Sequence, residues 1–104
     1  MKHYEVFISQ KACEDMEAIY DYIAETLLNP TAAVKQYNRI ADAILTLEEM
    51  PERIKIMNSE PERSNGLRPL IVDKYTVFFV VKNDTVHITR VLYSSSDIVK
   101  RLSE

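Results

Sequence analysis

Two apolar patterns with helical spacing lie on either side of Asn29-Pro30, and they limit the fold more than any other feature of the sequence. The apolar positions are Ala12, Met16, Ile19, Tyr20, Ile23 and Leu27 before this dipeptide, and Ala33, Tyr37, Ile40, Ile44 and Leu47 after it. Such spacing gives each helix one apolar face. Pro30 disfavours the helical conformation at Asn29 but suits the first turn of a new helix. A turn this short predicts two antiparallel helices packed face to face.

The rest of the chain has the pattern of strands. Residues 4–8 alternate with period two and lead into Ser9, a helix-capping residue type. Residues 67–72, 75–82 and 85–93 are rich in β-branched and aromatic residues and are separated by Asp73-Lys74 and Asn83-Asp84. Connections of this length predict hairpins, and therefore an antiparallel meander.

The remaining segments complete the predicted order. Residues 52–65 are polar and predict a surface loop, with a short strand over residues 54–57 as one option. Asp97 and the serines before it can cap a short helix that includes Ile98 and Leu102. We therefore expect an α+β fold of order β-α-α-β-β-β-α. In it, an antiparallel helical hairpin packs on one face of a small antiparallel sheet, and residues 1–104 form one domain.

Charge and composition exclude several classes of protein. Residues 1–51 carry four basic and nine acidic side chains, whereas residues 52–104 carry nine basic and seven acidic ones. This balance disfavours free-standing binding to nucleic acid, which needs a clear basic excess. The longest apolar run, Val77–Val81, is too short for a membrane span, and the first residues do not have the pattern of a secretory signal. The lone Cys13 fits a reducing compartment, so we expect a cytoplasmic protein without a membrane partner.

The sequence predicts no metal site and no cofactor. The single Gly66 excludes a glycine-rich phosphate loop, and His3, His87 and Cys13 lack the spacing of zinc ligands. Cys13 is better explained as a buried or half-buried thiol than as a nucleophile, and His87 as a surface histidine than as a catalytic base. The acidic side of residues 14–25 is better explained as a solvated helix face than as paired catalytic carboxylates.

Arg68, Arg90 and Tyr93 are the candidate catalytic residues. Arg68 stands at the start of an otherwise apolar strand, and Arg90 stands in phase with Val86 and Ile88. A charged residue within a strand needs either a partner or an open face of the sheet. Two arginines on neighbouring strands would form an anion-binding surface for a phosphate or an acidic peptide. The alternative is that each arginine pairs with a helix carboxylate, such as that of Glu48 or Glu49, and only stabilises the fold.

Segments along nearly the whole chain resemble the RelE/ParE superfamily of toxins from type II toxin–antitoxin systems. These segments are Tyr4–Ser9 leading into Ala12 and Asp15, Ile19–Ala24, Asn29–Ala33, Leu47–Glu52, Gly66–Leu70, Tyr75–Val81 and Val86–Tyr93. The order and spacing of the segments carry the resemblance. The fold of that superfamily, a helical hairpin against an antiparallel sheet, agrees with the order predicted above.

The resemblance implies a small toxin that inhibits bacterial growth, as in plasmid stabilisation, and that a cognate antitoxin silences. RelE-like members are mRNA interferases, endoribonucleases that cut mRNA on the translating ribosome. This reaction needs a base, an acid and cations around the phosphate. ParE-like members are gyrase inhibitors that poison DNA gyrase without being nucleases.

This chain departs from the nuclease pattern after the last strand. The superfamily usually carries His or Tyr followed by basic residues there, whereas this chain has Tyr93 followed by Ser94–Ser96. Tyr93 could still transfer a proton, with Arg68 and Arg90 as the remaining cations. The missing basic residues, the acidic balance and the long hairpin favour a ParE-like gyrase poison, with a RelE-like interferase as the alternative and an inactive, antitoxin-binding relic as a third reading. The antitoxin is expected to cover the hairpin and an open sheet edge, with acidic residues near Arg68 and Arg90.

Overall fold

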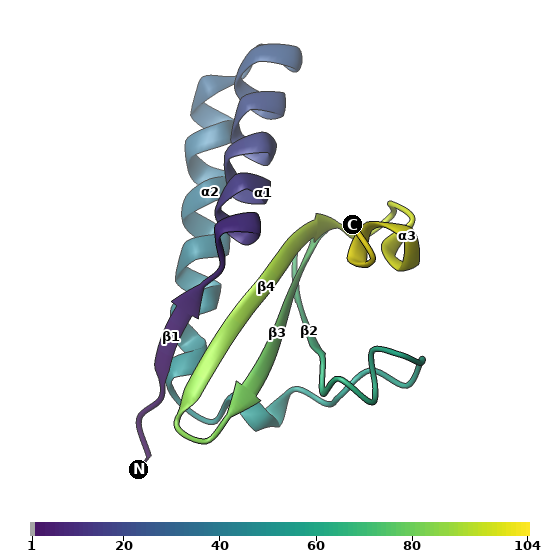
Figure 1. Ribbon diagram of the computed structural model, residues 1–104. Helices are drawn as coiled ribbons and strands as arrows, with labels where there is room; N and C mark the ends of the chain where they lie inside the picture. Colours follow the sequence, from purple (N-terminus) through teal and green to yellow (C-terminus); the bar gives the residue numbers. More distant parts are fainter. Residues whose placement is uncertain (1) are drawn as a thin grey trace.

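A computed structural model describes residues 2–104 and has the predicted element order. Strand β1 (Glu5–Ile8) leads into helix α1 (Gln10–Asp21), which continues as a π-helical turn, η1 (Tyr22–Thr26). Helix α2 (Pro30–Leu45) runs back beside it, as Figure 1 shows. Ser9 and Asn29 cap the two helices by accepting hydrogen bonds from the backbone N–H groups of Ala12 and Ala32, and Pro30 occupies the first turn of α2. The predicted helical hairpin is confirmed.

The sheet has the order β1-β4-β3-β2, built from β2 (Arg68–Val72), β3 (Tyr75–Lys82) and β4 (Thr85–Tyr93). The three later strands form the predicted antiparallel meander. Strand β1 instead joins β4 in the parallel direction, with Glu5 opposite Thr85 and Ile8 opposite Ile88. A parallel pair needs a long connection, and here the helical hairpin and the first two strands of the meander supply it.

Short 3₁₀ turns, η2 (Thr46–Glu48) and η3 (Pro51–Arg53), follow α2, and an irregular loop connects them to β2. The optional strand over residues 54–57 does not form. Its polar groups bond elsewhere: the carbonyl of Ile54 accepts from the Arg68 guanidinium, and the N–H of Met57 donates to the carbonyl of Leu67. The polar loop itself is as predicted.

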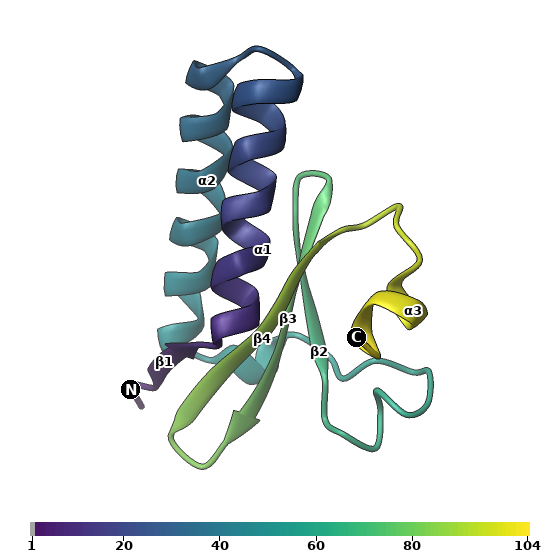
Figure 2. The same ribbon diagram turned by 45° about the horizontal axis from the view of Figure 1, so that its top comes forward.

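Two hydrophobic clusters lie on opposite faces of the sheet. The larger cluster packs the helical hairpin against one face and includes Ile40, Ile44, Phe79 and Ile88. The smaller cluster consists of Leu67, Phe78 and Leu92, with Ile98 and Leu102 of the short helix α3 (Ile98–Leu102) packed against it. The consecutive residues Phe78 and Phe79 thus point to opposite faces, as the pleat of a strand requires. Figure 2 shows α3 and the hairpin on different sides of the sheet.

Candidate functional site

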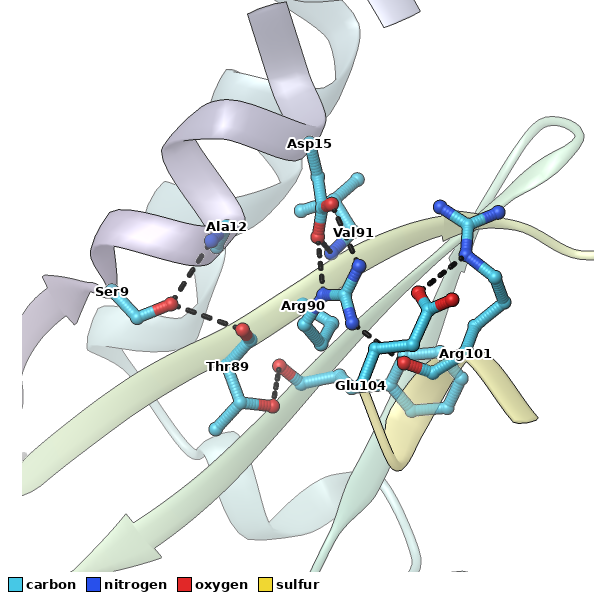
Figure 3. Close-up of polar contacts among 9 residues, drawn as sticks. Ser9, Ala12, Asp15, Thr89, Arg90, Val91, Arg101 and Glu104 are labelled. Carbon is cyan, nitrogen blue, oxygen red and sulfur yellow. Dashed lines mark hydrogen bonds and ion pairs between the residues drawn. The ribbon is translucent and has the colours of Figure 1, made fainter. Parts of the chain in front are cut away.

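Arg90 is buried where α1, β4 and α3 meet. Its Nε donates to Asp15 Oδ2 at 2.7 Å and its Nη2 to Asp15 Oδ1 at 2.9 Å, while its Nη1 donates to the carbonyl oxygen of Arg101 at 2.6 Å (Figure 3). The side chains of Arg90 and Asp15 are only 8% and 10% exposed. The hydrogen bonds that Arg90 donates to Asp15 raise the pKa of Arg90 above its ordinary value, and this effect outweighs the lowering by burial. The alternative of a helix carboxylate as partner is therefore correct for Arg90, but the carboxylate is Asp15 rather than Glu48 or Glu49.

An irregularity in β4 sets the direction of Arg90. Ile88 lies opposite Phe79 and Arg90 lies opposite Phe78, so Thr89 is an extra residue in the register. Such a bulge shifts the alternation of side chains by one residue. Val91, rather than Arg90, joins Ile88 in the larger hydrophobic cluster. The predicted phase of Arg90 with Val86 and Ile88 is therefore wrong.

The same carboxylate also stabilises the end of the parallel pair. Asp15 Oδ2 accepts a hydrogen bond from the backbone N–H of Val91 at 3.0 Å, beyond the last paired residue of β1. Ser9 extends this linkage, because its hydroxyl donates to the carbonyl of Thr89 while it caps α1 (Figure 3). Asp15 and Ser9 thus replace the partner that β4 loses where β1 turns into the helix.

Arg68 lies on the other face of the sheet. It is opposite Phe79, whereas Arg90 is opposite Phe78, and the whole of β3 separates the two arginines. The Arg68 side chain is 13% exposed, and its Nη1 donates to the carbonyl of Ile54 at 2.6 Å. Its Nη2 lies 3.8 Å from Glu52 Oε2, and its Nε has no hydrogen-bond partner among residues 2–104. The predicted exposed surface formed by two arginines on neighbouring strands is wrong.

Tyr93 lies at the end of β4 and is exposed. Its ring packs edge to face on Tyr75, with 5.7 Å between the ring centroids. Burial raises the pKa of Tyr75 above its ordinary value, and the neighbouring Tyr93 and Tyr22 add to this. Two serines after Tyr93 form hydrogen bonds within the chain: the Ser94 hydroxyl bonds to that of Thr76 on β3, and the Ser96 hydroxyl donates to the carbonyl of Tyr93. A catalytic role for Arg68, Arg90 or Tyr93 stays a prediction.

These tyrosines line a groove of about 700 Å³ between the helical hairpin and the end of the sheet. Tyr22, Ile23 and Leu27 of the first helix form one wall, and Tyr75 and Tyr93 form the other. Lys74 and Arg101 place cationic groups at this groove. Sequence patterns missed the groove, because Tyr22 appears as a polar-side residue of a helix and Tyr75 as the first residue of a strand. A cluster of three tyrosines is visible only after the chain is folded.

The other candidate residues have structural surroundings. Cys13 is exposed, so the prediction of a buried or half-buried thiol is wrong. His87 is partly buried, and its ring stacks on that of Phe7 with 5.5 Å between the ring centroids. Within residues 2–104 no three or more His, Cys, Asp and Glu side chains gather as a metal site would need. In the same part of the chain, no helix has the length and apolar character to cross a membrane.

Known structures share this fold of helical hairpin and sheet. The chromosomal ParDE toxin–antitoxin system from P. aeruginosa is 26% identical, matches 88% of this chain and 96% of that one, and has a TM-score of 0.73. The RelBE2 toxin–antitoxin complex from Mycobacterium tuberculosis is 19% identical over 88% of this chain and 98% of that one, with a TM-score of 0.58. The archaeal RelE–RelB complex from Pyrococcus horikoshii is 18% identical over 89% and 97% of the two chains, with a TM-score of 0.59.

The fold is thus that of toxins from type II toxin–antitoxin systems, which confirms the RelE/ParE fold predicted from the sequence. Residues 6–98 match the profile of the ParE toxin of the type II toxin–antitoxin system parDE. The chain therefore belongs to the ParE toxin family. No curated protein matches it in a sequence comparison.

Proposed function

We propose that this ParE-family toxin acts in the cytoplasm, where it arrests bacterial growth by poisoning DNA gyrase and is silenced by a cognate antitoxin. The main observation in favour of gyrase over mRNA is that the Arg90 guanidinium is already paired within the chain. Its three donor atoms are used by Asp15 and by the Arg101 carbonyl. RNA cleavage requires cations that face the phosphate in the transition state. Arg68 lies on the opposite face, and Ser94–Ser96 supply no cation in place of the usual basic residues.

The alternative, a RelE-like ribosome-dependent mRNA interferase, is favoured by one feature. Tyr93 is exposed beside the groove, so it remains available for proton transfer. Such a reaction would need a cationic neighbour for Tyr93, since the ordinary pKa of tyrosine is near 10, and only Lys74 and Arg101 among the residues lining the groove could serve. The translating ribosome with its mRNA would then be the target instead of gyrase.

The groove and the outer edge of β2 are the surfaces that we assign to the antitoxin. Strand β2 forms one edge of the sheet, and Ile71 on this strand is exposed. An edge strand accepts an extended segment of another chain through backbone hydrogen bonds. The groove would hold apolar antitoxin side chains, and acidic ones would lie near Lys74 and Arg101. Because Arg68 and Arg90 are largely buried, acidic antitoxin residues are no longer expected beside them.

One pair of assays separates the two targets. Purified toxin is added to a DNA supercoiling reaction with gyrase and, in parallel, to a translating extract whose mRNA ends are mapped. For a gyrase poison, supercoiling stops and cleaved DNA accumulates while the mRNA stays whole. Cuts in mRNA at the ribosomal A site with normal supercoiling would overturn the proposal.

Two variants test whether any mRNA cleavage in the translating extract depends on the candidate catalytic residues. If mRNA is cut, Tyr93→Phe should abolish the cuts, because it removes only the hydroxyl that would transfer the proton. Arg68→Ala serves as the second variant, since Arg68 is the other cationic candidate. Expression of the folded wild-type chain without any growth arrest would instead identify an inactive relic that binds only its antitoxin.

A further inference from the structure

The tip of the helical hairpin, formed by Tyr22, Leu27 and Leu28, presents apolar side chains to water. Leu28 is 82% exposed, and Tyr22 and Leu27 are each 55% exposed. The backbone of Leu28 has a φ of 53°, in the left-handed region. Residues with a Cβ rarely adopt this region, and glycine or asparagine usually occupies it where a helix ends. The stability of the isolated chain therefore explains neither the side chain nor the conformation of Leu28.

The tip is held in place by the chain itself. The N–H of Leu27 donates to the carbonyl of Tyr22 at 3.0 Å, and the N–H of Asn29 donates to the carbonyl of Ile23 at 3.1 Å. These bonds close the π-helical turn, a feature that recurs at functional sites. Figures 1 and 2 show the tip at the end of the hairpin that points away from β1. Leu28 thus lies on a hydrogen-bonded turn at the projecting end of the hairpin.

Acidic side chains lead along the first helix to this tip. Glu14, Glu17, Asp21 and Glu25 follow one another at intervals of three or four residues, which places them on one side of the helix, and all are exposed. None of them forms a salt bridge with a described residue of the chain. Asp21 and Glu25 lie near the carboxyl end of the helix, where the helix dipole disfavours negative charge. A basic surface on a partner would be complementary in charge to all four side chains.

We infer that this tip is the part of the toxin that docks on its protein target. Leu28 and Leu27 enter an apolar recess whose rim carries lysine or arginine side chains, and these side chains face the acidic residues of the first helix. This inference rests on the proposed function, since gyrase handles DNA and its DNA-binding surfaces must be basic. Tyr22 and Leu27 also line the groove, so an antitoxin segment seated there covers one side of the tip.

The decisive variant is Leu28→Asn. Asparagine suits the left-handed backbone, so the thermal unfolding midpoint should stay the same or rise. Growth arrest should be lost, and the toxin concentration that half-inhibits gyrase supercoiling should rise about ten- to hundredfold, as expected for one large apolar side chain lost from an interface. The matched control is Leu45→Asn, which replaces another exposed leucine at the opposite end of α2 and should leave inhibition unchanged.

A charge reversal tests the basic rim. Asp21→Lys combined with Glu25→Lys should weaken inhibition at low salt, and the difference from wild type should shrink as salt screens the charges. Asp42→Lys, an exposed acidic position on α2, is the control for charge alone. A folded Leu28→Asn variant that still arrests growth like wild type would overturn the inference. Wild type that arrests growth but leaves gyrase active would contradict only the gyrase target, and growth arrest then remains the readout for the tip.

Discussion

The two ends of the helical hairpin differ in how their side chains are satisfied. At the base, Asp15 accepts three hydrogen bonds, from two atoms of Arg90 and from the N–H of Val91, and almost none of this pair is exposed. At the tip, Leu28 lies in water on a left-handed backbone, and the acidic residues beside it lack a cationic partner in residues 2–104. The base therefore stabilises the fold, whereas the tip leaves apolar and acidic side chains open to solvent, where we infer that a partner docks.

The contrast between base and tip shows that the type of a residue does not by itself predict its role. Arginine within a strand suggests an anion-binding surface, but Arg90 connects α1, β4 and α3 instead. An exposed leucine at a turn suggests a tolerant loop, yet Leu28 has the left-handed backbone that leucine rarely adopts, and we infer that it contacts a partner. The charged Arg90 has a structural role, whereas the apolar Leu28 is the candidate contact residue. Their surroundings, and not their residue types, determine these roles.

The largest expected effect is at the base. Asp15→Ala leaves the guanidinium of Arg90 buried without a counter-charge, so the free energy of unfolding should fall by about 3–5 kcal/mol. Denaturant titration measures this loss. The double variant Asp15→Ala with Arg90→Met should recover part of it, because the buried charge is then gone. Arg39→Ala breaks an exposed pair with Asp73 and should lower the free energy of unfolding far less, because water screens the two charges. Equal losses of unfolding free energy in Asp15→Ala and Arg39→Ala would contradict the special contribution of the buried pair at the base.

A smaller difference is expected between the two helix caps. Ser9 at the base caps α1 and also donates to the Thr89 carbonyl, whereas Asn29 near the tip only caps α2. Ser9→Ala should therefore cost about 2 kcal/mol of unfolding free energy and Asn29→Ala about 1 kcal/mol. Chemical denaturation of both variants checks the order. If Asn29→Ala costs more, the tip contributes more to stability than its exposure suggests.

The smallest effect concerns Asp73, in the turn between β2 and β3. The hydrogen bond from Arg39, assisted by Gln36, lowers the pKa of the Asp73 carboxyl below its ordinary 3.8. The stabilisation from this pair is therefore present above the ordinary pKa and is lost as the pH falls through the lowered value. In Arg39→Met, the Asp73 pKa should rise toward 3.8, as followed by NMR of the carboxyl carbon. An unchanged titration would show that the pair does not persist in solution.

The sequence predicted the helical hairpin, the meander and the element order because these depend on local periodicity and turn residues. The sequence did not predict the positions of Arg68 and Arg90 correctly, and the reason is specific. The bulge at Thr89 carries no glycine or other local signal, yet it turns Arg90 away from the face of Ile88. The predicted meander already placed β3 between the strands of Arg68 and Arg90, so these two strands are not neighbours.

The groove and the tip were missed for a related reason. Tyr22, Tyr75 and Tyr93 come from three segments and meet only through tertiary packing. Asn29-Pro30 did locate the turn, but a left-handed leucine before it is the opposite of what helix-ending preferences lead one to expect. Asp15 was counted with the acidic helix face, although it is the one acidic residue of α1 that lies buried beside a strand 75 residues away.

The parallel pairing of β1 with β4 has a consequence for synthesis in the cell. The first strand must wait for the last one, because its partners begin 80 residues later in the chain. The sheet therefore cannot form step by step during translation. It is completed only when residues up to about Ile88 have left the exit tunnel of the ribosome. A prematurely terminated chain that lacks β4 would have no place for β1 and no anchor for Asp15. The folded toxin is therefore absent until β4 has emerged, and an already made antitoxin has that interval in which to meet the growing chain.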